Sequence, residues 1–314
     1  MIKGDVILHV AFCIFSCLSG ILPLKIGRGS MSKNKKMGVR YFLLSFLITF
    51  SVVTLIALAV LSNLLNPAPA HNITDNVPKF EHNYTDSDSI TVLCIGYSRK
   101  QPQTAYYSLL KLDAPNKRVL VTSIPADTKI GEKTLTETAS YSGSAAATEA
   151  LAKALDIKID RYLRIEETSF SSIVDTLGAV TIDLENAVEH YDENGFLDYS
   201  MNKGRHVFFG ERLCGLIRYS GKDETERANA QSAILASLFS QRLESGKYDD
   251  PQKIFETVIN SSESNINVFD FENRRAAIEQ ITKDKDISFV TISFAANEDK
   301  TPSEEYLKSM SAYK

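Results

Sequence analysis

The residues best suited to chemistry lie in one segment, IRYSGKDETERANAQ, at positions 217–231. Arg218 precedes a turn that contains Lys222, and Arg227 and Gln231 follow it four residues apart, on one face of an expected helix. A guanidinium group offers a two-pronged donor that matches a phosphate, so the segment predicts a phosphate-binding site. Taken alone, the same residues also fit a solvated helix start with polar i,i+4 pairs.

A second candidate is Asp127, in the stretch VLVTSIPADTKI at 119–130. A run of β-forming residues stops at Pro125, which has no N–H to give to a sheet, so a strand is expected to end there. Residues at the mouth of such a strand often face a pocket. Asp127 is therefore a candidate site residue, while its neighbour Ala126 offers only a methyl group.

Other familiar catalytic patterns are absent from the sequence. There is no P-loop, no Gly-x-Ser-x-Gly and no His-Glu-x-x-His, and the five histidines are scattered. Cys94 and Cys214 are isolated, which favours buried free thiols over a zinc site or a disulfide framework. No metal site is predicted from spacing.

The elements that would position these residues are those of an α/β domain at 89–314. Alternating strands and helices predict an α/β/α sandwich with a mixed sheet. Strands are expected at 90–96, 105–113, 118–124, 161–167, 179–184 and 287–294, with a hairpin turn at 114–117. Helices are expected at 142–155, 169–178, 209–219, 223–243, 251–261 and 270–281.

The N-terminal part predicts a membrane anchor. Residues 41–62 carry no Asp, Glu, Lys or Arg and match the ~20 apolar residues that cross a bilayer as a helix. The preceding residues 25–40 hold six basic residues and no acidic one, which places them in the cytoplasm and the rest of the chain outside. Residues 63–88, which include three prolines, read as an extracytoplasmic linker.

Two interpretations of residues 1–40 remain open. The uncharged stretch 6–24 forms a first transmembrane segment in one, giving two membrane helices. In the other, Met31 is the true start and the protein has one anchor. Both give the same orientation, with the main domain on the outer side of the cell membrane.

The charge distribution excludes a general nucleic-acid binder. Residues 1–66 hold seven basic residues and one acidic residue, whereas the remainder holds 28 basic and 38 acidic residues, a net charge of −10. Phosphate-backbone contacts need clustered positive charge, so any anion site must be local.

The order of signals from residue 90 to 231, with five motifs in sequence, resembles the LytR–CpsA–Psr (LCP) family of cell-envelope proteins. SIPADT resembles the family's Ser-Ile-Pro-Arg-Asp-Thr, and ASYSGSAAATEALAKALDIKIDRYLRIE its Ala-Tyr-x-x-Gly segment with the following helix and strand. FSSIVDTLGAVTIDL, KGRHVFFGERLCGLIRYS and ERANAQ resemble three further family signatures, the last of these being Gly-Arg-x-x-Arg-Gln.

The resemblance implies an α/β/α domain with an apolar tunnel for a polyprenyl tail. It also implies an arginine cluster that grips a (pyro)phosphate, and aspartates that hold Mg²⁺. The implied reaction is transfer of a lipid-linked glycopolymer to peptidoglycan. Carried onto this chain, it makes Arg218, Arg227 and Asp127 the catalytic candidates, with Gln231, Arg99 and Lys222 as further phosphate ligands.

The chain departs from the family pattern at several of these positions. Ala126, Ser220 and Ala230 stand where the family has arginines. The two metal aspartates fall on Ser98 and near Ala105, and residues 97–112 contain no acidic residue.

Two main hypotheses follow. In the first, the protein binds a polyprenyl-linked glycopolymer, has degraded transferase activity and regulates or scaffolds wall assembly. In the second, it is an active phosphotransferase with a rearranged site in which Arg99, Lys100 and Lys222 supply the charge. A third, a DNA-binding regulator, conflicts with an acidic domain outside the membrane.

Overall fold

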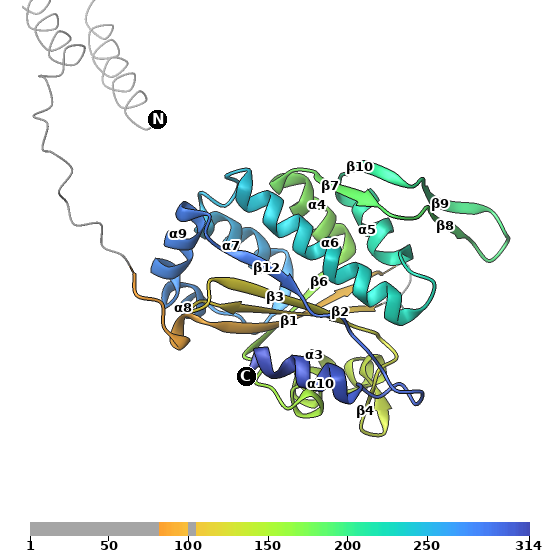
Figure 1. The fold of residues 1–314 in the computed structure, drawn as a ribbon, viewed down its shortest axis with the longest axis horizontal. Coiled ribbons are helices and arrows are strands. Elements are labelled where there is room, and N and C mark those ends of the chain that lie inside the picture. Colours follow the sequence, from red (N-terminus) through yellow and green to blue (C-terminus); the bar gives the residue numbers. More distant parts are fainter. Residues whose placement is uncertain (1–81, 100–104) are drawn as a thin grey trace, which may run out of the picture. The chain divides into compact units, whose positions relative to one another are not determined.

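The domain is built on a six-stranded mixed sheet, seen in a computed structural model that describes residues 82–99 and 105–314 (Figure 1). The strand order is β11-β6-β1-β2-β3-β12. These strands are β1 (Ile90–Tyr97), β2 (Ala105–Asp113), β3 (Arg118–Ile124), β6 (Arg161–Glu166), β11 (Ser262–Ser264) and β12 (Ser288–Thr291). The predicted α/β domain with a mixed sheet is confirmed.

Strand pairing follows the predicted hairpin. β2 and β3 pair antiparallel around the predicted turn at 114–117, and β1 pairs antiparallel with β2. β6 lies parallel to β1, and β12 parallel to β3, each reached through helices. The carboxyl end of β1 and the start of β2 therefore meet at one edge of the sheet, with Tyr97 opposite Ala105.

Helices cover both faces of the sheet (Figure 1). One face carries α4 (Glu167–Leu177), α5 (Gly210–Tyr219), α6 (Glu224–Glu244) and α7 (Pro251–Asn260). The other carries α3 (Leu135–Leu155), α10 (Glu304–Ser309) and the 3₁₀ turns of η2 (Met310–Tyr313). α4 to α7 correspond to the predicted helices, and Gly178 ends α4 with φ 104°, a conformation that favours glycine.

The helix α3 begins earlier than its predicted start at residue 142. Thr134 accepts a hydrogen bond from the backbone of Glu137, and the Glu137 side chain accepts one from the backbone of Thr134, a capping box that starts the helix at Leu135. Gly143 then interrupts it with φ 83°. The predicted cap at Ser142 or Ser144 therefore marks a break inside a longer helical segment.

The helix predicted at 270–281 divides into α8 (Val268–Glu272) and α9 (Arg275–Asp284). Asn267 caps α8 through its side chain, which accepts hydrogen bonds from two backbone N–H groups. Three small two-stranded sheets were not predicted: β4 (Lys129–Ile130) with β5 (Lys133–Thr134), β7 (Val180–Leu184) with β10 (Gly204–Phe208), and β8 (Val188–Tyr191) with β9 (Leu197–Met201). Of these strands, only β7 matched a predicted element.

The described chain begins with residues that the sequence assigned to the linker. Residues 82–88, including the 3₁₀ turn η1 (Asp86–Asp88), pack on the domain, and the backbone N–H of His82 donates to Gln280 on α9. Within residues 82–99 and 105–314 no helix is long and apolar enough to cross a membrane. The predicted anchor at 41–62 and the alternatives for residues 1–40 lie outside the described residues.

The two faces of the sheet are packed differently. Towards α3 and α10, the buried residues form one close cluster that includes Leu93, Leu109, Leu151 and Tyr306. On the other face of the sheet, a separate cluster of buried residues is centred on α4, α5 and α6. Between that second layer and the sheet lies an open space, and this space defines the candidate site.

Candidate functional site

An apolar cavity of about 450 Å³ runs between the sheet and the layer formed by α4, α6 and α7. Its floor is formed by every second residue of β1 from Ile90 to Gly96. These residues lie on one face of the sheet, because successive side chains of a strand point to opposite faces. Six residues of strand span about 20 Å at ~3.3 Å per residue. The cavity is therefore elongated, and its walls suit a long hydrocarbon chain.

The helix α7 closes one side of this cavity without burying any of its own residues. Ile254, Phe255, Val258 and Ile259 all line the cavity and all remain half-exposed. An apolar helix face that the protein covers only in part is a surface that an apolar ligand could bury further.

A polar pocket of about 400 Å³ adjoins the cavity at the end where β1 and β3 finish. Tyr106 and Gln231 line both spaces, so they form the boundary between them. Asp127 and Arg227 line the polar pocket together with Ala126. The structure thus brings together three of the predicted site residues, Asp127, Arg227 and Gln231, at the polar end of an apolar cavity.

Arg218, the first predicted phosphate ligand, lines neither space, but it lies beside the boundary residue Tyr106 and is already paired. Its guanidinium group donates to the carboxylate of Glu167, the first residue of α4, whose side chain lines the apolar cavity. The two side chains are only 21% and 14% exposed. Burial opposes the charged form of Arg218, but bonds with Tyr219 and Tyr106 and the charge of Glu167 raise its pKa overall.

Tyr106 remains protonated at the boundary. Burial raises the pKa of its phenol to about 12, against the opposing effect of the neighbouring Arg218. The phenol can therefore donate a hydrogen bond to an anion that reaches the boundary. Among the described residues, Nε of Arg218, Nε of Arg227 and one carboxylate oxygen of Glu167 are buried without a hydrogen-bond partner.

The charged side chains that line the polar pocket also have partners of opposite charge. Arg227 forms an ion pair with Glu224, one turn earlier on α6. Asp127 accepts a bond of 2.6 Å from Lys300, which comes from the loop before α10. Gln231 is buried, and its amide donates to the carbonyl of Ile217 at 3.2 Å, which links α6 to α5. Two cations thus face two carboxylates, and the pocket has no excess positive charge.

Two predicted phosphate ligands lie elsewhere. Arg99 pairs with Glu166 at 3.2 Å at the end of β6, its side chain 75% exposed. Lys222 is exposed in the turn between α5 and α6, and neither residue lines the polar pocket. Lys100 lies outside the described residues. The backbone turn of Lys222 is held by Glu226, which accepts its N–H at 2.9 Å.

The positions where the resemblance places metal aspartates do come together. Ser98 directly follows β1, and Ala105 begins β2 opposite Tyr97 and lines the polar pocket. A hydroxyl and a methyl group there give a divalent cation no carboxylate, the ligand that Mg²⁺ prefers. No cluster of three or more His, Cys, Asp or Glu that could hold a metal occurs in the described part of the chain. Ser98 and Ala105 therefore supply neither of the two carboxylates that the resemblance implies for Mg²⁺.

Both described cysteines face the cavity as neutral thiols. Cys94 on β1 and Cys214 on α5 line its wall, and burial raises the pKa of each to about 12. They are unpaired, as predicted. In this state they behave as small apolar side chains rather than nucleophiles.

Sequence reasoning missed four residues that shape the site: Tyr106, Glu167, Glu224 and Lys300. The i,i+3 spacing of Glu224 and Arg227 was a usable signal, because such pairs face each other on a helix. No local pattern could have linked Lys300 to Asp127, which is 173 residues away. Glu167 and Arg218 are likewise joined only by the packing of α4 on α5.

Fold and site together define a class of protein: a three-layered α/β domain that offers an amphiphilic ligand an apolar cavity with a polar mouth. The model of the LytR_cpsA_psr family matches residues 62–313. The chain therefore belongs to the LytR–CpsA–Psr family, as the five motifs predicted.

A curated relative agrees with this assignment. The polyisoprenyl-teichoic acid–peptidoglycan teichoic acid transferase TagV of Bacillus subtilis (strain 168) is 26% identical over 175 residues. The matched region covers 51% of this chain and 44% of TagV, so the chain spans less than half the length of that relative.

Solved structures share the fold. A putative transcription regulator from Eubacterium siraeum has a TM-score of 0.65 at 16% identity, covering 73% of this chain and 92% of its own. B. subtilis TagV has a TM-score of 0.54 at 19% identity, with coverages of 72% and 95%. TagT bound to LI-WTA has a TM-score of 0.55 at 17% identity, with coverages of 75% and 93%.

Proposed function

We propose that this protein binds a polyprenyl-(pyro)phosphate-linked glycopolymer at the outer face of the cell membrane, and that it has weak or no transferase activity. It would then regulate or scaffold the attachment of glycopolymer to peptidoglycan. The observation that carries the binding proposal is the junction at Tyr106 and Gln231, where an apolar cavity meets a polar pocket. The tail would occupy the first and the phosphate would lie at the boundary.

The residues at the boundary support this assignment of roles. The Tyr106 phenol is a protonated donor, and the guanidinium groups of Arg218 and Arg227 each keep a buried Nε without a partner. A phosphate oxygen accepts hydrogen bonds of this kind. Names of relatives support the ligand class, since TagV is named a teichoic acid transferase and TagT was solved bound to LI-WTA.

The weak-activity part of the proposal rests on charge. Phosphoryl transfer is accelerated mainly by cations placed where negative charge develops, and losing one such donor costs about 10²–10³ in rate. Here Glu167 and Glu224 neutralise the two arginines, and Ser98 and Ala105 supply no metal ligand. A rearranged active site built on Arg99 and Lys222 has less support, because both side chains are exposed and neither lines the polar pocket, whereas Arg218 is half-buried beside Tyr106.

The test uses the full chain in detergent with a lipid-linked pyrophosphate glycopolymer, Mg²⁺ and a peptidoglycan acceptor, with TagV as the active control. We expect saturable binding of the lipid and turnover at least about 10³-fold below TagV. Turnover comparable to TagV would refute the weak-activity proposal. If binding is absent while TagV binds, the ligand assignment itself fails.

The alternative, an active enzyme, has its own test in cells. Under that hypothesis the double substitution of Arg218 and Arg227 by Ala abolishes a measurable wall-attachment activity. Under our proposal, attachment carried out by this protein alone is already at background, and the substitution changes only lipid binding.

A further inference from the structure

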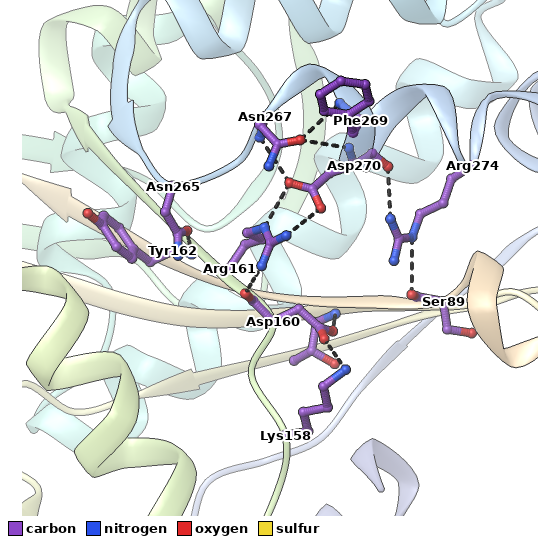
Figure 2. A network of polar contacts seen from close by, with 11 residues as sticks. Ser89, Lys158, Asp160, Arg161, Tyr162, Asn265, Asn267, Phe269, Asp270 and Arg274 are labelled. Carbon is purple, nitrogen blue, oxygen red and sulfur yellow. Dashed lines mark hydrogen bonds and ion pairs between the residues drawn. The ribbon is translucent and has the colours of Figure 1, made fainter.

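The end of the domain opposite the polar pocket carries an apolar pair that nothing in the described chain covers. Val268 and Phe269 open the helix α8, and they are 54% and 71% exposed. Figure 2 shows the ring of Phe269 pointing away from the polar contacts that hold its helix. Just before them, Ile266 points inward and lines the apolar cavity.

The short helix that presents this pair is held rigidly (Figure 2). Arg161, at the start of β6, donates two hydrogen bonds of 2.7 and 2.8 Å to the carboxylate of Asp270. Asn267 and Asp270 form a capping box. Arg274 donates to the carbonyls of Ser89 and Asp270. A five-residue segment fixed in this way displays its apolar side chains rather than leaving them free to turn inward.

The apolar end of the cavity lies at this same end of the sheet. Ile90, Leu112 and Val119 are register partners across β1, β2 and β3, and all three line the cavity. They are six residues of strand, about 20 Å, from the polar boundary at Gly96 and Tyr106. The stacked rings of Phe255, a cavity residue, and Phe271 connect the cavity to α8.

The chain also joins the domain here. His82, where the described residues begin, is bonded to Gln280 on α9, and α9 contacts α8 and follows it. Between the apolar stretch at 41–62 and His82 lie nineteen residues, which reach at most about 65 Å even when fully extended. The anchor predicted at 41–62 would tether the point where His82 meets the domain within about 65 Å of a bilayer, and such a tether raises the effective concentration of membrane for a weak contact.

We infer that Val268 and Phe269 form a membrane-docking surface, and that α8 seats the apolar end of the cavity against the lipid bilayer. In this orientation the polar pocket, about 20 Å further along the sheet, faces away from the membrane. The charges around α8 are mixed, with Asp270 and Glu272 beside Arg274 and Arg275. The docking is thus driven by apolar contact, and it does not depend on anionic lipid.

The absence of tryptophan from the sequence gives a clean probe of this inference. The full chain is reconstituted into vesicles of phosphatidylethanolamine and phosphatidylglycerol whose acyl chains carry bromine, which quenches nearby indole fluorescence. Phe269→Trp reports on α8. Phe196→Trp is the matched control, because Phe196 is 72% exposed and belongs to the β8–β9 hairpin at the opposite end of the domain (Figure 1).

We expect bromolipid to quench the Phe269→Trp variant strongly and the Phe196→Trp variant less than about a third as much, since docked side chains enter the acyl boundary. Equal quenching, stronger quenching of the control, or no quenching of either would overturn the inference. The inference would also be overturned if the full chain did not float with the vesicles. The same holds if a second copy of the chain, and not lipid, covers the Phe269→Trp indole, so that bromine does not quench its fluorescence. Lipid binding in detergent needs no bilayer, so the proposed function can succeed where this orientation fails.

Discussion

Replacing Glu167 by Gln is the sharpest test of the charge balance at the site. The substitution keeps the shape of the side chain but removes the counter-ion of Arg218. Two unit charges about 4 Å apart interact by about 4 kcal/mol at an effective dielectric constant of 20. Desolvation of the pair offsets much of that attraction. If roughly a third of the 4 kcal/mol attraction becomes available to a bound phosphate, the affinity for polyprenyl phosphate rises about tenfold.

The same change has an opposite effect on the free protein. A half-buried guanidinium without its carboxylate costs about 1–3 kcal/mol, which lowers the melting temperature of a domain of this size by about 3–10 °C. Saturating lipid then raises the melting temperature more in the variant than in the wild type, because tighter binding stabilises the folded state more. The assay combines calorimetric titration of the full chain in detergent with thermal melts, with and without ligand.

The matched control is Glu263→Gln, which removes the partner of Arg164 at a site where the two side chains are 36% and 61% exposed. It should change neither affinity nor stability by a measurable amount, as is usual for a surface pair. If Glu167→Gln binds lipid equally or more weakly while the control is unchanged, Glu167 is not a competitor for the phosphate, and our account of the weak activity is refuted.

Two further predictions concern the cavity and its distal end. Cys94→Trp places an indole in the apolar cavity and should weaken binding of long-chain polyprenyl phosphate at least about tenfold. In competition titrations a short-chain phosphate should bind as before. Unchanged long-chain affinity would contradict the assignment of the cavity to the lipid tail. Burial raises the pKa of Asp270, but hydrogen bonds from Arg161 and from the backbone of Asn267, with the charges of Arg161 and Arg274, outweigh this and hold the pKa below its usual range. Its stabilisation is therefore present above about pH 4 and is lost as the pH falls through the lowered value. Thermal melts should show Asp270→Asn less stable than wild type at pH 7, with a difference that shrinks towards about pH 2; a difference independent of pH would exclude this ion pair as its cause.

Much of the architecture was readable in the sequence because it is encoded locally. The apolar run at residues 90–96, the turn at 114–117 and the glycine at 178 each specify a local backbone feature through neighbouring residues. The five motifs likewise identified the family. The predictions failed where a local signal was misread, as with the capping box at Thr134, or where strands are short and irregular in register, as with β8 and β9.

The candidate site divides in the same way. Asp127, Arg227 and Gln231 were found because a strand end and a helix face place them predictably, and they do share one pocket. The sequence could not give the partners of these groups. Glu167 reaches Arg218, and Lys300 reaches Asp127, only through packing of segments 51 and 173 residues apart.

The sequence by itself thus determined the family, the layered fold and the residues that could contact a phosphate. It also showed, through Ala126, Ser98 and Ala105, that the family's usual charges are reduced. Only the tertiary structure decided that Arg218 and Arg227 are each paired with a carboxylate, and that an open apolar cavity lies beside those pairs. The reason is physical: residue type fixes the charge a side chain can carry, whereas long-range packing fixes what that charge faces.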